Sequence, residues 1–136
     1  MQSSTTSFDP VRVLIVDDHE SMLARAAAVL TPSCMVVGAV TNGPAAIEAA
    51  AALRPDVIVM DISMPGMNGF ELASKLRCGG SKAALVFLTV HDEEAFVKAA
   101  MAAGATGYVV KARLASDLTL AVRDARAGRP FISKIS

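Results

Sequence analysis

The chain of 136 residues suits a single domain, and its thirteen basic and thirteen acidic side chains leave no formal net charge. This length buries enough surface for folding without a disulfide or a metal. Neither a signal peptide nor a membrane-spanning helix is expected, because the polar start lacks a basic region and no apolar run approaches roughly 18 residues. The balanced charge, with no basic stripe, disfavours direct contact with nucleic acid. Cys34 and Cys78 match no metal-ligand spacing, which favours free thiols in a reducing cytoplasm.

Five short apolar runs alternate with longer helical segments along the chain. The expected strands are 12–16, 35–40, 57–60, 85–89 and 107–110. Runs that are nearly all apolar are typical of strands buried on both faces of a parallel sheet. Five β-α units in succession predict an α/β fold, with a single-domain, doubly wound parallel sheet and right-handed crossovers.

Start and stop signals bound the helices between these runs. The expected helices run from 21 to 30, from 42–44 to 54–55, from 68–69 to 79–80, from 92 to 104 and from 116 to 128. Pro44 is tolerated in a first helical turn, and Ser116 is expected to cap the last helix. Ahead of the third helix, Pro65 and Gly66 predict a type II turn from Met64 to Met67, with a positive φ angle at Gly66.

Polar side chains stand where four of the expected strands end. The first strand leads to Asp17 and Asp18, the third leads to Asp61, the fourth ends in Thr89, and the fifth leads to Lys111. Ligands of open parallel sheets bind beyond the carboxyl ends of the strands. These five side chains are therefore expected to converge on one rim of the sheet.

Three carboxylates on one rim repel each other unless a cation neutralises them. Oxygen ligands favour Mg²⁺, and no histidine or cysteine is expected in this cluster, which argues against zinc. A carboxylate beside Mg²⁺ can attack a phosphoryl group, and Lys111 and Thr89 are suitable donors to its oxygens. Each residue also has an ordinary interpretation, such as a helix cap for Asp17 or Asp18 and a surface charge for Lys111. Their joint placement favours the functional interpretation.

These motifs resemble those of the receiver domains of bacterial two-component response regulators. The resemblance rests on Asp17-Asp18, on VMDISMPGMNG at 59–69, on Thr89 and on YVVK at 108–111, and it covers about 11–128. It implies the flavodoxin-like and CheY-like strand order 2-1-3-4-5. It also implies a disordered tail at 1–9, a receiver domain at 10–128, and a linker starting at 129–136.

The resemblance assigns a role to each acidic residue of the rim. It implies that Asp61 is the phosphoacceptor, which a sensor histidine kinase phosphorylates in a Mg²⁺-dependent reaction. Asp18 would ligate Mg²⁺ directly, and Asp17 would ligate it or hold a ligating water. Asp61 itself and the backbone carbonyl of Ser63 would supply further oxygens. Such a domain is a switch that catalyses only its own phosphorylation and dephosphorylation.

The same resemblance implies a conformational response. Lys111 and Thr89 would contact the phosphoryl oxygens, and movement of Thr89 would leave a space that Tyr108 turns inward to fill. His91 and Ser63 occupy positions that tune the lifetime of the phosphoryl group in this family. Val90 is larger than the residue that often follows the threonine, and its bulk could restrict access to the site.

The stretches 13–20, 88–91 and 104–111 are similar to those of the NarL/FixJ subfamily, whose members continue into a LuxR-type helix-turn-helix DNA-binding domain. The chain is therefore expected to be a receiver fragment of a transcription regulator, with a possible homodimer on phosphorylation. The alternatives are a stand-alone or degenerate receiver acting as an interaction module, a haloacid-dehalogenase-type phosphatase, and a flavodoxin. The phosphatase is disfavoured because Ser63 stands where its general acid is needed. A flavodoxin is disfavoured because no phosphate-binding loop follows the first strand.

Overall fold

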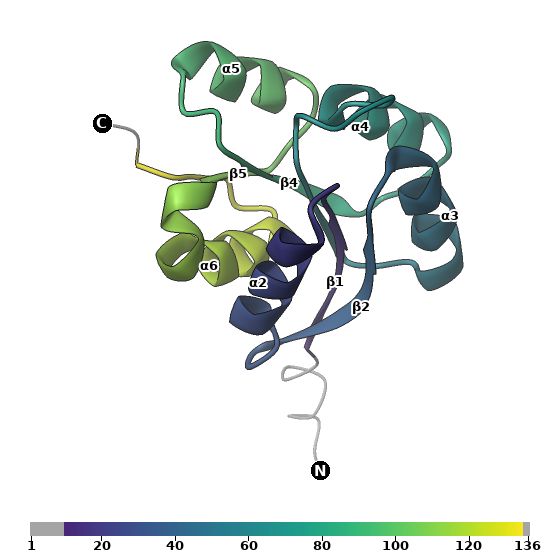
Figure 1. Cartoon of the computed structure of the whole chain (residues 1–136), viewed down its shortest axis with the longest axis horizontal. Helices are drawn as coiled ribbons and strands as arrows, with labels where there is room; N and C mark the ends of the chain where they lie inside the picture. The colour runs from purple at the N-terminus through teal and green to yellow at the C-terminus, as the bar shows by residue number, and fades with distance from the viewer. Residues whose placement is uncertain (1–9, 135–136) are drawn as a thin grey trace.

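A six-stranded parallel sheet lies between two layers of helices in the computed structural model, which describes residues 10–134 (Figure 1). The strands are β1 (Val11–Val16), β2 (Cys34–Val40), β3 (Val57–Met60), β4 (Ala84–Thr89), β5 (Gly107–Val110) and β6 (Phe131–Ile132). Their order is β2-β1-β3-β4-β5-β6, so the predicted order of the first five strands is confirmed. The sixth strand was not predicted. The N-terminal tail expected at 1–9 lies outside the described residues.

Five α-helices cover the two faces of the sheet. They are α2 (Glu20–Leu30), α3 (Gly43–Leu53), α4 (Gly69–Cys78), α5 (Glu94–Ala102) and α6 (Leu114–Arg126). Helices α2 and α6 pack on one face, and α3, α4 and α5 pack on the other (Figure 1). Each face of the sheet has its own hydrophobic core, and a strand in the middle of the sheet contributes alternate side chains to the two cores. This is why the sequence of β3, VIVM, is apolar throughout and fully buried.

Two helices on the second face begin at asparagine caps. The Asn42 side chain accepts a hydrogen bond from the backbone N–H of Ala45 at the start of α3. At the start of α4, Asn68 and Glu71 cap each other's backbone N–H groups in a reciprocal capping box. These caps fix where α3 and α4 begin, and α4 begins at one of the two residues expected from the sequence.

The start of the last helix differs from the expectation. A short 3₁₀ helix (Lys111–Arg113) follows β5 directly, and α6 begins at Leu114, so the prediction that Ser116 caps this helix is wrong. The Ser116 hydroxyl instead donates to the Asp117 carboxylate at 2.9 Å. The chain therefore turns into α6 without the loop that a serine cap would require.

The C-terminal segment is fastened to the sheet by buried polar contacts. Ser133 donates its backbone N–H to the Tyr108 carbonyl, and its hydroxyl accepts a hydrogen bond from the backbone N–H of Val110. The same hydroxyl donates to Asp117 at 2.7 Å. Burial alone would raise the pKa of Asp117, but hydrogen bonds from Arg113, Ser133 and Ser116 outweigh burial and hold the pKa below its usual value. Part of the segment expected to start a linker is thus packed on the domain as β6.

Candidate functional site

The register of the sheet places two acidic residues side by side. Val16 pairs with Met60, so the next residues along the chain, Asp17 and Asp61, leave the sheet at the same level. Asp61 donates its backbone N–H to the Val16 carbonyl, and Asp17 donates its own to the Val40 carbonyl. Both side chains are almost fully buried. The expected meeting of the first and third strand ends is therefore observed.

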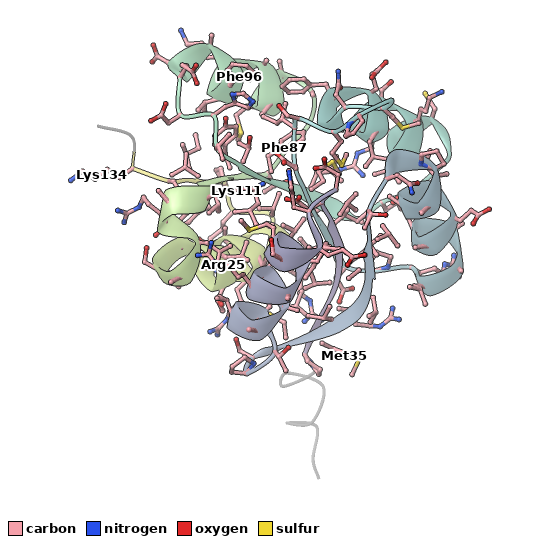
Figure 2. All side chains as sticks on the ribbon, viewed as in Figure 1. Arg25, Met35, Phe87, Phe96, Lys111 and Lys134 are labelled. Carbon is pink, nitrogen blue, oxygen red and sulfur yellow. The ribbon has the colours of Figure 1, made fainter. Side chains whose placement is uncertain are left out.

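Lys111 lies between these two carboxylates. Its Nζ is 2.9 Å from Asp17 Oδ2 and 3.0 Å from Asp61 Oδ2, with 11% of the side chain exposed. Burial alone would lower the pKa of Lys111, but the hydrogen bonds and charges of Asp17 and Asp61 outweigh burial and raise the pKa above its usual value. Lys111 is therefore a cation held in the middle of the rim, where Figure 2 labels it.

Asp18 and His19 complete the acidic end of the rim. His19 Nδ1 lies 3.3 Å from Asp17 Oδ1 and 3.2 Å from Asp18 Oδ1, and these three side chains offer ligand atoms within 4.8 Å of one another. The expectation that no histidine joins the cluster is therefore wrong. His19 immediately follows the acidic pair, and its backbone N–H also donates to Asp17. That adjacency was visible in the sequence, but the direction of the imidazole ring was not.

The oxygen atoms of this cluster fit a hard divalent cation. Asp17 Oδ2 and Asp18 Oδ1 are buried, and each has one close nitrogen neighbour, Lys111 Nζ at 2.9 Å and His19 Nδ1 at 3.2 Å, but neither neighbour lies in hydrogen-bond geometry. Buried carboxylate oxygens are costly unless a donor or a cation satisfies them. The chemistry of these donors suits Mg²⁺, which takes one or two carboxylates and completes its shell with water and phosphate oxygens.

Ser63 and His91 form a second polar pair next to Asp61. The backbone N–H of Ser63 approaches Asp61 Oδ1 at 3.4 Å, and Ser63 Oγ lies 2.7 Å from His91 Nε2. The His91 ring stacks on Phe96 with their centroids 4.1 Å apart. The His91 ring is therefore held on two sides. Ser63 and Phe96 also line a hollow of about 540 Å³ together with Met64 and Asn68.

The turn after Asp61 is tighter than the sequence predicted. Gly66 has the expected positive φ of 81°. The hydrogen bond, however, runs from Met67 N–H to the Pro65 carbonyl at 3.0 Å, which closes a three-residue γ-turn rather than a four-residue type II turn. Beyond the turn, the backbone N–H of Gly69 donates to the Ile62 carbonyl at 2.7 Å and so holds the start of α4 against the end of β3.

Thr89 and Tyr108 lie inside the protein at the ends of β4 and β5. Both side chains are fully buried, and the Tyr108 hydroxyl donates to the His91 carbonyl at 2.7 Å. Thr89 Oγ1 accepts a hydrogen bond from the backbone N–H of His91, so one residue links the two side chains. The Tyr108 hydroxyl is therefore bonded within the protein. Val90, by contrast, is 68% exposed.

The environment of Tyr108 predicts an unusual titration. Burial, reinforced by the negative charges of Glu93, Asp92 and Asp61, raises the pKa of Tyr108 to about 12. Because the chain has one tyrosine and no tryptophan, ultraviolet absorbance reports this phenol alone. We expect phenolate absorbance to appear near pH 12 in the folded protein, followed by circular dichroism, and near the ordinary pKa of about 10 in urea. A midpoint near 10 in the folded protein would contradict the buried position.

Comparisons with known proteins place the chain in a family. The model of the response regulator receiver domain matches residues 13–123, and the chain belongs to this family. It is 36% identical over 128 residues to the nitrate/nitrite response regulator protein NarL of Escherichia coli K12, covering 93% of this chain and 59% of that protein. It is 34% identical over 125 residues to the response regulator GacA of Pseudomonas viridiflava, covering 90% of this chain and 58% of that protein. The chain thus spans about three fifths of these relatives.

Solved structures agree with this assignment. The signal receiver domain of the putative response regulator NarL from Mycobacterium tuberculosis has a TM-score of 0.79 and 35% identity, covering 89% of this chain and 99% of that one. The isolated REC domain of RcsB from Salmonella enterica serovar Typhimurium, in the presence of phosphomimetic BeF₃⁻, has a TM-score of 0.84 and 25% identity, covering 93% and 95%. The chain is therefore a receiver domain similar to those of NarL-type transcription regulators. None of the helices within residues 10–134 has the length and apolar character needed to cross a membrane.

Proposed function

We propose that Asp61 accepts a phosphoryl group from a sensor histidine kinase in a Mg²⁺-dependent reaction. The observation that supports this most directly is the position of Lys111, whose Nζ lies within 3.0 Å of both Asp17 and Asp61. A fixed cation beside a carboxylate reduces the repulsion that an incoming phosphoryl group would meet. Asp61 lies at the rim of the sheet and Lys111 is not fully enclosed, which is compatible with approach of the donor.

Each side chain of the rim would then have a defined task. An Asp61 carboxylate oxygen would attack phosphorus, forming an O–P bond as the P–N bond to the kinase histidine breaks and the imidazole takes a proton from solvent. Lys111 would pair with the phosphoryl oxygens. The Thr89 hydroxyl would donate to them, since its oxygen already accepts from His91 and none of the described residues accepts its proton.

Asp17, Asp18 and Asp61, with the backbone carbonyl of Ser63, would hold the Mg²⁺ ion. When bound, the ion would neutralise the carboxylates and polarise the phosphoryl oxygens. The buried oxygens Asp17 Oδ2 and Asp18 Oδ1 support this role, because single ion-pair contacts with Lys111 and His19 leave them room for a further cation. Ser63 and His91, hydrogen-bonded beside Asp61, would control how readily water reaches the phosphoryl group.

Thr89 and Tyr108 would form the switch. Both side chains contact the backbone of His91, so a shift of Thr89 toward the phosphoryl group would act on the same residue that holds the Tyr108 hydroxyl. Phosphorylation would then favour the buried position of Tyr108 over any outward one. The NMR signals of the Tyr108 ring should therefore change on addition of beryllofluoride and Mg²⁺. Ring signals that stay the same while amides around Asp61 shift would contradict this coupling.

The role of this domain in a longer protein is inferred from the response regulators to which the chain is similar. We infer that the receiver controls a LuxR-type helix-turn-helix output domain in the cytoplasm, with DNA contacted by that domain and not by the receiver, and that phosphorylation favours a homodimer. In this proposal residues 10–128 are the receiver and 129–136 lead toward the output domain. The free thiols of Cys34 and Cys78 are compatible with a reducing compartment.

The phosphoacceptor is tested by intact mass after incubation with acetyl phosphate and Mg²⁺. The wild type should gain one phosphoryl group, and Asp61→Asn should gain none, because an amide oxygen is a poor nucleophile in the same position. Asp124→Asn, which alters a carboxylate on α6, should be labelled like the wild type. Equal labelling of the Asp61→Asn protein, or steady release of phosphate from a simple phosphate ester, would contradict the proposal.

A further inference from the structure

A second large hollow lies at the end of the sheet opposite the Asp61 rim. It has a volume of about 840 Å³ and is formed where α3 ends, where α4 ends, and where β3 and β4 begin. Asp56, which lines it, precedes β3, whereas Asp61 follows the same strand. A volume of this size falls within the usual range for small-molecule sites, roughly 300–1,000 Å³. The hollow is therefore a separate site on the same scaffold.

Basic side chains dominate this hollow. Arg54, Lys75, Lys82 and Arg126 line it, and Asp56 is the one carboxylate among its lining residues. Asp56 already accepts a hydrogen bond from the backbone N–H of Arg12 at 2.9 Å. Four cations against one carboxylate leave a net charge of three positive. Such a concave positive surface attracts anions.

Three of these cations are not engaged with the protein. The side chains of Arg54, Lys75 and Lys82 form no ion pair or hydrogen bond within residues 10–134. At the end of α4 the backbone already serves the last carbonyls, because Gly80 N–H bonds the Arg77 carbonyl and Ser81 N–H bonds that of Leu76, so the two lysines are not needed there. The cationic groups are therefore available to a ligand.

The wall of the hollow is held in place. Arg77, just outside the lining, donates from Nη1 to the Ser81 carbonyl at 3.0 Å and to the Ala83 carbonyl at 2.7 Å, which fixes the loop that carries Lys82. Within residues 10–134, Arg54 is the one residue other than glycine that has a positive φ angle, 49°. Its carbonyl accepts a hydrogen bond from Arg12 Nη1. At the C-terminal end of a helix, a left-handed backbone conformation is usually adopted by glycine or asparagine. Here an arginine occupies it and extends the basic lining.

Apolar side chains cover part of the same hollow. Ile47 on α3 and Leu76 on α4 also line it, together with Pro55 and Ala83. Inorganic phosphate would use the cations but not these apolar groups. A ligand with several negative charges and a flat apolar body would use both. We propose that this pocket binds an organic phosphate of nucleotide size, independently of phosphorylation at Asp61.

The test is a titration of the ¹⁵N-labelled protein with ADP in the absence of divalent cations, followed by NMR. We expect saturable shifts confined to residues around the pocket, at 47–56, 75–83 and 126. Lys82→Ala should weaken binding roughly tenfold, the loss expected for one charge-assisted contact. Lys98→Ala, the same change on an exposed lysine of α5, should leave affinity unchanged. Asp61→Asn should also bind like the wild type.

A second variant separates binding from folding. Arg54→Gly removes a cation where the backbone itself favours glycine, so the protein should stay folded while affinity for ADP falls roughly tenfold. Equal affinity of the Lys82→Ala and Lys98→Ala variants would overturn the proposal. Binding of inorganic phosphate as tightly as ADP, or preference for an acidic peptide over ADP, would overturn it as well.

Discussion

Replacing Gly69 with alanine should destabilise the protein by about 2–3 kcal/mol, the cost of forcing an atom into a filled space. An added Cβ would lie 2.4 Å from the Asp61 carbonyl oxygen, 2.8 Å from Phe87 Cε1 and 2.9 Å from Ile62 Cα. Two of these three atoms belong to the backbone and cannot rotate away. The end of β3 or the start of α4 must therefore move. Urea unfolding followed by circular dichroism would measure the loss.

The same substitution should impair the site as well as the fold. Any displacement that relieves the clash changes how the backbone of Asp61 and Ile62 packs against the start of α4, so labelling by acetyl phosphate should slow in the fraction that remains folded. Gly79→Ala is the matched control, because Gly79 has a negative φ and its added Cβ would come no closer than 3.3 Å to Lys75 O. Its unfolding free energy should change by less than about 1 kcal/mol. A Gly69→Ala protein as stable as the Gly79→Ala protein would contradict the packing described.

Replacing Lys111 with methionine should cost about 3 kcal/mol of unfolding free energy when divalent cations are removed with EDTA. The reason is that Asp17 and Asp61, with 3% and 6% of their side chains exposed, would face each other without the cation that now separates them. Methionine keeps a similar length and apolar stem, so loss of packing contributes little.

Added Mg²⁺ should restore stability more to this variant than to the wild type. A ligand that binds the folded state stabilises it by mass action. The carboxylates of the variant, no longer paired with Lys111, should attract Mg²⁺ more strongly than those of the wild type. Labelling at Asp61 should nonetheless remain slow, because Mg²⁺ does not replace the ammonium that pairs with the phosphoryl group. Lys98→Met serves as the control and should change neither quantity. If the Lys111→Met protein had the same unfolding free energy as the wild type, both with and without Mg²⁺, Lys111 would not balance the charge of the two carboxylates.

Much of the fold was accessible from the sequence because its signals are local. The strands β3 and β5 were predicted with their observed bounds, since each is a short apolar run between clear breaks. The convergence of Asp17, Asp61 and Lys111 followed from strand ends alone, because parallel strands present their carboxyl ends at one rim. Sequence reasoning succeeds here where one physical rule determines the placement.

The misses depend on contacts between distant residues. Strand β6 has two residues, too few for a pattern, and it forms because Phe131 donates to the Thr106 carbonyl and Ser133 bonds Tyr108 and Asp117. The pairing of Ser63 with His91 joins residues 28 positions apart. No periodicity or cap signal encodes such a contact. The Tyr108 hydroxyl likewise bonds the carbonyl of His91, a residue 17 positions away along the chain.

The attachment of Ser133 to β5 has a mechanical consequence. Its two hydrogen bonds grip β5 at Tyr108 and Val110, on either side of Val109, and Val110 is the residue directly before Lys111. A rearrangement that moves the Lys111 backbone toward an incoming negative group must therefore move Ser133 as well, or break these two hydrogen bonds. The C-terminal segment is thus linked by hydrogen bonds to the strand that leads directly into Lys111.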